Sequence, residues 1–340
     1  MPGHDIITIG SSAGGVEALK YIVAGLPADV PAAMFVVQHI RATEPSLLAE
    51  ILSHAGPLPA VHPRDGEPIQ SGHIYIAPPD HHMLPWHGHI HVVRGPKENG
   101  FRPAIDATFR TAARSYGPRV VGVVLTGMLD DGTAGLLAIK RRGGIAVVQE
   151  PAEAAFPSMP TNALRYVSVD AVLSIAEMPS MLTHFAHEPA FAEGEMAMTD
   201  DVNLESAISD MDFQAMQHSN MLGTPSSITC PDCGGVLVEY YDGDLLRFRC
   251  QVGHAFSPES LNAQQTDDLD AQLWAAYRAL DERASLARRL AQNAHRSNDQ
   301  IGERRFMQRC ELAEQKKRQL LQLLAEEKDK RPDVQQLPEE

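Results

Sequence analysis

Apolar residues form short continuous runs over about the first 185 residues, and a helical pattern of apolar positions follows most of these runs. Continuous apolar strands that alternate with helices are typical of a doubly wound, mostly parallel sheet with helices on both faces. We therefore expect an α/β fold. The predicted strands cover residues 6–9, 32–38, 120–125 and 145–149, and the predicted helices cover residues 16–26, 45–54 and 134–142.

Two further apolar segments, residues 73–77 and 89–93, alternate with polar positions and lie close together in the chain. Alternation of this kind favours half-buried strands. We predict that the two segments pair as a hairpin inserted into the α/β pattern.

The second half of the chain changes character. Residues 186–225 are rich in acidic, Met, Ser and Asn residues, which predicts a linker with some helical pieces. A compact cysteine-containing module is expected at 226–260, helices at 261–330, and a disordered tail at 331–340. The predicted α/β domain itself spans residues 1–185.

The helical segment has apolar residues spaced alternately by four and three positions. This spacing predicts either a helical hairpin or coiled-coil helices that pair with a second chain, which would make a homo-oligomer. Lys317 falls on the apolar seam of the second helix, which therefore fits the pattern less well. The first helix has Leu273, Tyr277, Leu280, Ala284, Ala287 and Ala291 on its seam, and the second has Phe306, Cys310, Ala313, Leu320 and Leu324.

Composition narrows the classes of function. The 340 residues carry a net charge of −15, which argues against nucleic acid as a partner. No run of about 18 apolar residues occurs, so we expect no membrane insertion. The first residues lack a basic segment ahead of an apolar run, and the first cysteine is Cys230. Both features favour a cytoplasmic protein in a reducing compartment.

The first predicted strand runs into a small-residue turn, ITIGSSAGGVEAL, at residues 7–19. Its glycines do not match a dinucleotide fingerprint, and no lysine stands where a P-loop needs one. The turn still places backbone N–H groups at a helix N-terminus, where they can stabilise an oxyanion. Ser11 and Ser12 could be helix caps, or one of them could be a nucleophile.

A serine nucleophile needs a base and a group that orients the base. His39 follows the strand at residues 32–38, and Asp130 and Asp131 follow the strand at residues 120–125. The carboxyl ends of neighbouring parallel strands meet at one edge of a sheet, so these side chains are placed to meet Ser12. Each residue taken alone could equally serve a cap or a turn.

Six segments along the first half of the chain form a recognisable series: IGSSAGGVEAL, VVQHI, HIYIAPPDHHM, RPAIDATFRTAA, VVLTGMLDDGTAGLLAIKRRGG and SMPTNAL. Together they resemble the successive motifs of a known family, the CheB-type chemotaxis protein-glutamate methylesterases of bacterial signal transduction. They occur in the same order as in that family and cover about residues 4–185. Family members hydrolyse methyl esters on glutamate side chains of chemoreceptors, and some deamidate receptor glutamines.

The resemblance implies a role for each candidate residue. Ser12 would be the nucleophile, His39 the base, and Asp131 the orienting carboxylate. Backbone at Ala13 and Met128 would bind the oxyanion. The substrate would be a methylated chemoreceptor helix, and catalysis would need no cofactor.

The chain departs from the common family pattern at several positions. Ala13 stands where Thr is usual, Leu129-Asp130 where Gly-Asn is frequent, and Phe101 where His is frequent. These changes leave the substrate preference open. The usual receiver domain is also expected to be absent, so a separate signalling regulator would replace control in cis. The alternatives are a catalytically silent signalling scaffold and an esterase of the same mechanism with a different substrate.

The cysteine module contains CPDCGG at residues 230–235 and FRCQVGH at residues 248–254. Cys230, Cys233, Cys250 and His254 would supply a complete tetrahedral shell for structural zinc. A hairpin turning at residues 242–243 would bring the two halves together. A redox dithiol and plain thiols are the alternatives. Cys310 lies on the helical seam and is expected to be a core residue.

Overall fold

The computed structural model describes residues 3–40, 42, 45–190, 200–212, 215 and 223–330. The chain divides into two compact units, residues 1–262 and 263–340. The predicted tail at 331–340 lies outside the described residues, as does much of the predicted linker. The part of the linker that is described includes helix α7 (Asp200–Ser209). The domain boundaries given above stay predictions.

The first unit is built on a seven-stranded sheet in the order β10-β9-β8-β1-β2-β5-β3, in which all neighbours run parallel. This confirms the predicted doubly wound α/β fold. The central strands are buried along their whole length, as their continuous apolar sequences require. The strands are β1 (Ile6–Ser11), β2 (Ala33–Gln38), β3 (Ala60–Val61), β5 (Ile74–Ile76), β8 (Val120–Val124), β9 (Ile145–Gln149) and β10 (Ala171–Leu173).

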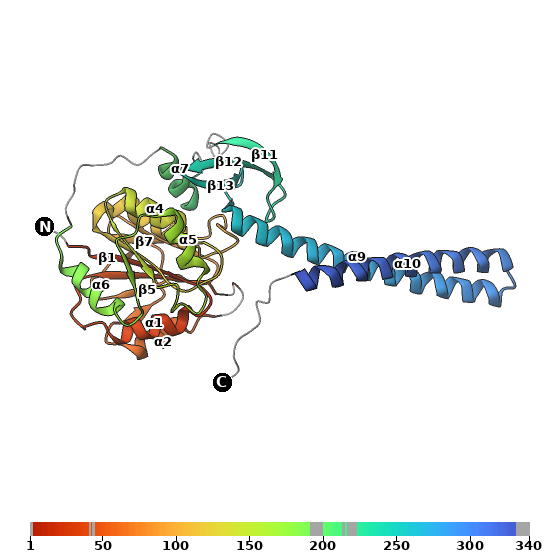
Figure 1. Ribbon diagram of the computed structural model, residues 1–340, viewed down its shortest axis with the longest axis horizontal. Coiled ribbons are helices and arrows are strands. Elements are labelled where there is room, and N and C mark those ends of the chain that lie inside the picture. The colour runs from red at the N-terminus through yellow and green to blue at the C-terminus, as the bar shows by residue number, and fades with distance from the viewer. Residues whose placement is uncertain are drawn as a thin grey trace. The chain divides into compact units, whose positions relative to one another are not determined.

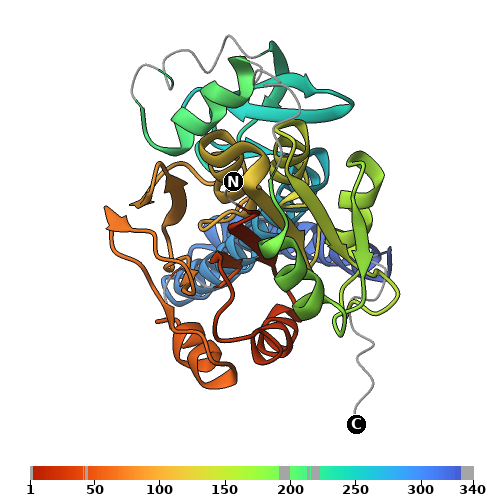
Figure 2. The ribbon, with the colours of Figure 1, turned by 90° about the vertical axis from the view of Figure 1, so that its left-hand side faces the viewer.

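Helices cover both faces of this sheet (Figures 1 and 2). One apolar core lies under α1, α2 and α6, and a second lies under α3, α4 and α5. Within the described ranges, no helix is both long enough and apolar enough to cross a membrane. The helices are α1 (Gly15–Ala24), α2 (Leu48–Ala55), α3 (Ile105–Tyr116), α4 (Thr133–Arg141), α5 (Ser158–Tyr166) and α6 (Met178–His187).

The inserted hairpin exists, but one of its predicted strands was wrong. Residues 74–76 form β5 of the main sheet, because Ile74, Tyr75 and Ile76 are all buried as an interior strand demands. The strand β7 (His89–Val93) pairs instead with β6 (His82–Trp86) and with the short β4 (Glu67–Pro68). The strand β6 was not predicted from the sequence, because it contains Pro85 and proline is unusual within a strand.

A four-stranded antiparallel sheet completes the first unit, and we call residues 223–257 the β module. Its central hairpin is the one predicted, with Asp242 paired to Leu245 across the turn. The aromatic residues Phe248 and Phe256 pack with two of the cysteines in its core. The strands are β11 (Thr224–Thr229), β12 (Val236–Asp242), β13 (Leu245–Cys250) and β14 (Ala255–Phe256).

The second unit is a helical hairpin of α9 (Pro258–Arg296), which begins in the first unit, and α10 (Gln300–Lys330). Helix α9 starts earlier than predicted, with a proline as its first residue. Small residues of both helices, Cys310 among them, are buried against each other. Lys317 is accommodated on the seam because its ammonium group contacts Asp281 at 2.8 Å and Glu314 at 2.9 Å. Pairing with a second chain stays a prediction.

Candidate active site

Three strand ends lie side by side at one edge of the main sheet. Strand β1 lies between β2 and β8, with Ser11 opposite Gln38 and Gly10 opposite Val124. Ser12 follows β1 directly, and His39 follows β2. The loop after β8 leads through residues 126–131 to helix α4. The edge of the sheet therefore collects the three predicted side chains, as the topology of a parallel sheet requires.

The structure brings Ser12, His39 and Asp131 together in one hydrogen-bonded chain. The His39 Nδ1 atom lies 3.2 Å from the Ser12 hydroxyl oxygen. The His39 Nε2 atom lies 2.8 Å from Asp131 Oδ2. The His39 side chain is only 4% exposed and that of Asp131 only 1%, whereas Ser12 is half-buried. The serine can thus be reached from outside while its two partners are shielded from water.

Asp131 is held as a carboxylate by several donors. The Ile105 amide donates to Oδ2 at 2.7 Å, and the Asn99 side-chain amide donates to Oδ1 at 2.9 Å. Burial alone would raise the pKa of Asp131, but the hydrogen bond and charge of His39, with these two donors, outweigh burial and lower it. An ionised carboxylate in this position orients the His39 ring and stabilises its protonated form.

Gln38 ties the ends of β1 and β2 together. Its carbonyl oxygen accepts from the Ser11 hydroxyl at 2.7 Å, and its amide nitrogen donates to the Ser12 carbonyl at 2.8 Å. The same nitrogen donates to the His39 carbonyl at 3.0 Å. Gly15 is required here, because a Cβ at this position would lie 2.2 Å from the Gln38 oxygen. Ser11 therefore supports the turn, and only Ser12 faces the imidazole.

The loop after β8 closes over the serine turn, which places Ala13 beside the segment that contains Met128. The Ser12 amide donates to the Thr126 carbonyl at 3.0 Å, and the Thr126 hydroxyl donates to the Ala13 carbonyl at 3.0 Å. Gly127 approaches so closely that a Cβ there would lie 2.8 Å from Ser12 Cβ. Met128 is 40% exposed at the rim of this loop.

The next residue, Leu129, has φ +62°, a region that costs a bulky side chain energy. The Asn162 side chain of α5 donates to its carbonyl at 2.8 Å and so supports this conformation. Asn162 belongs to the SMPTNAL segment. The loop is thus fixed from α5 as well as from β1.

An aromatic ring covers the imidazole. Phe101 stacks on His39 with ring centroids 3.6 Å apart and planes inclined by 8°. The contact shields the ring from water and restricts its rotation.

The sequence did not predict three residues that bond to the candidate active site: Gln38, Asn99 and Asp106. Gln38 lies inside the VVQHI segment and could have been noticed as a polar residue at the end of an apolar strand. Asn99 lies in a polar loop with φ +53°, and Asp106 lies in the first turn of α3. Nothing in their local sequence connects either residue to Asp131, because the contacts span 32 and 25 positions along the chain.

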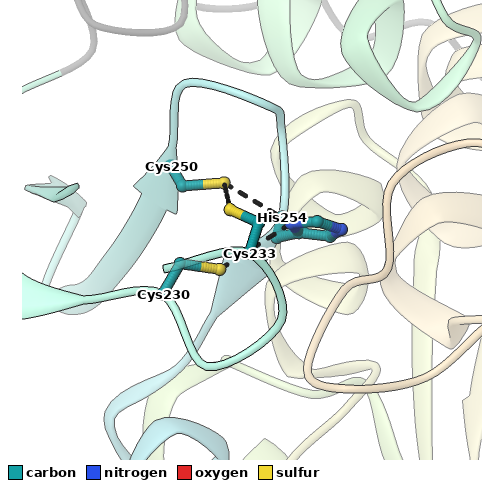
Figure 3. A group of neighbouring side chains, drawn as sticks. All are labelled: Cys230, Cys233, Cys250 and His254. Atoms are coloured by element: carbon teal, nitrogen blue, oxygen red, sulfur yellow. Dashed lines mark hydrogen bonds between the residues drawn. The ribbon is translucent and has the colours of Figure 1, made fainter. Parts of the chain in front are cut away.

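The four predicted metal ligands form one cluster in the β module (Figure 3). Their ligand atoms lie within 4.8 Å of one another, with Cys250 Sγ 3.5 Å from His254 Nδ1 and 3.6 Å from Cys233 Sγ. Tetrahedral zinc–thiolate bonds of about 2.3 Å imply sulfur–sulfur separations of roughly 3.8 Å. The cluster can therefore bind a metal ion.

The surroundings of the cluster fit this use. The pKa of Cys230 is raised because its thiol bonds to the Cys250 sulfur and is partly buried. Two adjacent thiolates repel each other, so both cysteines can be deprotonated together only when a cation lies between them. Both loops are also shaped as tight turns, since Gly234 donates to the Cys230 carbonyl at 2.8 Å and Gly253 donates to the Cys250 carbonyl at 2.9 Å.

Comparison with known proteins gives three concordant matches. A family profile described as CheB methylesterase matches residues 7–182. A putative protein-glutamate methylesterase/protein-glutamine glutaminase of Leptospira interrogans is 37% identical over 179 residues, which are 52% of this chain and 93% of that protein. The crystal structure of the CheB methylesterase catalytic domain of Thermotoga maritima is 33% identical, with a TM-score of 0.51, and covers 54% of this chain and 99% of that domain.

Other relatives are matched over only part of their length. Protein-glutamate methylesterase/protein-glutamine glutaminase 2 of Anaeromyxobacter dehalogenans is 38% identical over 178 residues, and the match spans 52% of each chain. The β module and the helical hairpin lie beyond the matched residues 7–182. The match to the profile and to nearly the whole Leptospira relative shows that the chain belongs to the CheB methylesterase family.

Proposed function

We propose that the chain is a serine hydrolase that cleaves glutamate γ-methyl esters on methylated chemoreceptor helices to glutamate and methanol. The single observation that carries this proposal is the hydrogen-bonded chain Ser12–His39–Asp131 at the edge of the sheet. The membership of the family and the names of its relatives support the substrate class.

The reaction begins when the Ser12 oxygen attacks the ester carbonyl carbon. His39 Nδ1 accepts the serine proton, and the Asp131 carboxylate stabilises the imidazolium through Nε2. We assign the backbone amides of Ala13 and Met128 to the oxyanion, because the hydrogen bonds of Thr126 and Ser12 join the two loops beside the serine.

The tetrahedral intermediate then collapses. The carbon–methoxy bond breaks, and methanol leaves with the proton held by His39. Water attacks the acyl-enzyme, gives a proton to His39, and the serine oxygen leaves with that proton. The same steps applied to a glutamine side chain would release ammonia, so we also propose glutaminase activity on receptor glutamines.

Methanol release from methylated receptor tests this proposal. Ser12→Ala is expected to lower turnover by about 10⁴- to 10⁶-fold, because the nucleophile is lost. Ser180→Ala is a matched control, since that serine is exposed on α6 and its hydroxyl donates to the Glu177 carbonyl at the start of the same helix. Equal methanol release by wild type and Ser12→Ala would refute the proposal. An inactive wild-type protein on this substrate would favour the scaffold or the esterase with another substrate.

We further propose that the cysteine–histidine cluster binds zinc as a structural ion. The donor set of three thiols and one imidazole suits zinc and leaves no position for substrate. Protein purified without chelator should contain one zinc per chain by elemental analysis. Absence of zinc from such protein would overturn this part of the proposal.

A further inference from the structure

The β module is joined to the loop that precedes α3 by backbone hydrogen bonds. The Asn99 amide donates to the Ala255 carbonyl at 2.7 Å, and the Ala255 amide donates to the Lys97 carbonyl at 3.2 Å. These bonds form a short parallel bridge between residues 98 and 255. Residues 97–99 therefore act as one more strand beside β14, and the position of Asn99 depends on the β module.

The side chain of Asn99 connects the β module to the catalytic aspartate. Its Oδ1 accepts from the Ser257 backbone amide at 3.0 Å and from the Ser260 hydroxyl at 3.1 Å. Its Nδ2 donates to Asp131 Oδ1 at 2.9 Å and to Asp106 Oδ2 at 3.0 Å. A backbone N–H can only donate, so the Ser257 amide fixes which end of Asn99 faces the β module. The NH₂ group must then face Asp131.

The Ser257 hydroxyl reaches the catalytic loop directly. It donates to Asp130 Oδ1 at 2.7 Å and lies 2.8 Å from the Ser260 oxygen. Asp130 immediately precedes Asp131, so this hydroxyl bonds to the loop that carries Asp131. Ser257 lies beyond residues 7–182, which the family profile matches.

Arg247 makes the second connection. Its guanidinium contacts Asp106 Oδ2 at 3.0 Å, and Asp106 Oδ1 accepts from the amides of Gly132 and Gly135 at 3.0 and 2.7 Å. Gly132, directly after Asp131, is the N-cap of α4, and Gly135 lies in the first turn of that helix. Asp106 and Asp131 are neighbouring buried carboxylates, and Arg247 supplies a positive charge that compensates for the pair.

The same junction buries further charges whose side chains are at most 4% exposed. Together with Asp106 and Arg247 they make three acidic and three arginine residues. Arg247 Nε and Nη2 have no hydrogen-bond acceptor among the described residues, although Nη2 lies 3.8 Å from Glu98 Oε2. Buried ion pairs are weak evidence for stability, so we interpret these charges as specifying how the β module packs at this junction. The closest pairs are Glu98 with Arg110 at 2.6 Å and Glu205 with Arg249 at 2.9 Å.

We propose that Arg247, Ser257 and Ser260 are positioning residues of the active site, which hold Asp131 and its loop through Asn99, Asp106 and Asp130. The β module is then part of the catalytic unit. The expected changes in kcat rest on the proposed hydrolase function. The expected fixed contact between Asp131 and His39 does not depend on which substrate the protein uses.

Serine variants test the first connection without changing charge. The double variant Ser257→Ala/Ser260→Ala removes the hydroxyl groups that face Asn99 and Asp130. Ser226→Ala is the matched control, because the Ser226 hydroxyl donates to the Leu237 carbonyl within the β module. The double variant is expected to lower kcat about 10-fold with KM unchanged, since misplaced catalytic groups slow chemistry more than they weaken binding.

Arginine variants test the second connection. Arg247→Met keeps much of the volume but leaves Asp106 without its cation, and we expect kcat to fall about 100-fold. Arg247→Lys retains a positive charge and should restore activity to within about 10-fold of the wild type. If Arg247 served stability alone, Arg247→Met would keep its kcat in assays run well below the melting temperature. Arg247→Lys would then have no lost activity to restore. The serine variants keep the proposal testable if Arg247→Met does not fold.

A spectroscopic measurement is independent of the substrate. The proton between His39 Nε2 and Asp131 Oδ2 should give a low-field ¹H NMR resonance in the full-length wild type. We expect it to broaden and move upfield in Ser257→Ala/Ser260→Ala but not in Ser226→Ala. An unchanged resonance in the double variant, together with unchanged kcat, would overturn the inference while leaving the proposed function intact. A shifted resonance in protein that releases no methanol would support the positioning role and refute the proposed function.

Discussion

Two polar clusters meet at Asn99, and they differ in the group that faces each buried carboxylate. In the catalytic cluster, the Asp131 carboxylate faces a histidine ring and, beyond it, a half-exposed serine. In the cluster at the β module, carboxylates face arginines and every member is fully or almost fully buried. An imidazole can gain and lose a proton near neutral pH, whereas a guanidinium cannot.

Two aspartates share Asn99, and their surroundings lead us to expect different roles for them. Asp131 can stabilise a proton that moves between Ser12 and His39. Among the described residues, the Asp106 carboxylate bonds to backbone amides, Asn99 and Arg247 and not to His39, so we expect it to hold a loop without taking part in proton transfer. We therefore expect Asp106 to act by holding its loop, and the proposed chemistry to depend on Asp131.

Exchanging each aspartate for asparagine should give the largest difference between the clusters. Asp131→Asn is expected to lower kcat by about 10⁴-fold, because an amide cannot stabilise the imidazolium. Asp106→Asn should cost about 10- to 100-fold, because it only loosens the loop. Steady-state methanol release measures both. Equal losses in the two variants would remove the distinction between the clusters.

Asp130 should make stability depend on pH. Burial raises the pKa of Asp130 to about 7 from 3.8 in the unfolded chain, although the hydrogen bond from Ser257 opposes the rise. Between pH 4 and 7 the folded protein then holds a proton that the unfolded chain has lost, so this contribution to stability falls as pH rises.

The Asp130→Asn variant mimics the protonated carboxyl and should lack this dependence. Relative to the variant, the wild type should lose up to about 3 kcal/mol of unfolding free energy between pH 5 and 8. Denaturant titrations of both proteins at each pH provide the comparison. Parallel pH profiles would show that Asp130 is ionised throughout.

Removal of the proposed zinc should weaken the β module and, through it, the active site. Cys233→Ser is expected to lower zinc content and melting temperature, and to reduce kcat about 10-fold through the contacts of Asn99. Cys310→Ser is the control, because Cys310 is a buried cysteine of the helical hairpin and is not one of the four clustered residues. Full activity in zinc-free Cys233→Ser protein would separate the β module from catalysis.

The ring that covers His39 should have the smallest effect. Phe101→Ala removes the stacked contact and should lower kcat by roughly 3- to 10-fold, which corresponds to the usual interaction free energy of an aromatic pair. Phe101→Tyr keeps the ring and should retain most activity. Were the tyrosine variant as impaired as the alanine variant, stacking would not be the relevant property.

Local patterns allowed four of the seven strands of the main sheet to be predicted, namely β1, β2, β8 and β9, together with the residues of both candidate sites. Apolar runs mark strands such as β8, and Ser12, His39 and Asp131 each follow a strand. The link through Asn99 could not be predicted, since it depends on how the β module packs against the loop before α3. The error over β5 has a similar origin, because strand pairing is a tertiary choice that alternation alone does not settle.

The pair of adjacent serines offers the most direct test of the central claim, that Ser12 attacks the ester. Ser11 contacts Gln38 and supports the turn, whereas Ser12 faces His39. In methanol release from methylated receptor, Ser12→Ala should lose at least about 10⁴-fold in turnover, while Ser11→Ala should lose less than about 10-fold. A Ser12→Ala variant that stays within about 10-fold of the wild type, or a larger loss in Ser11→Ala than in Ser12→Ala, would contradict the account.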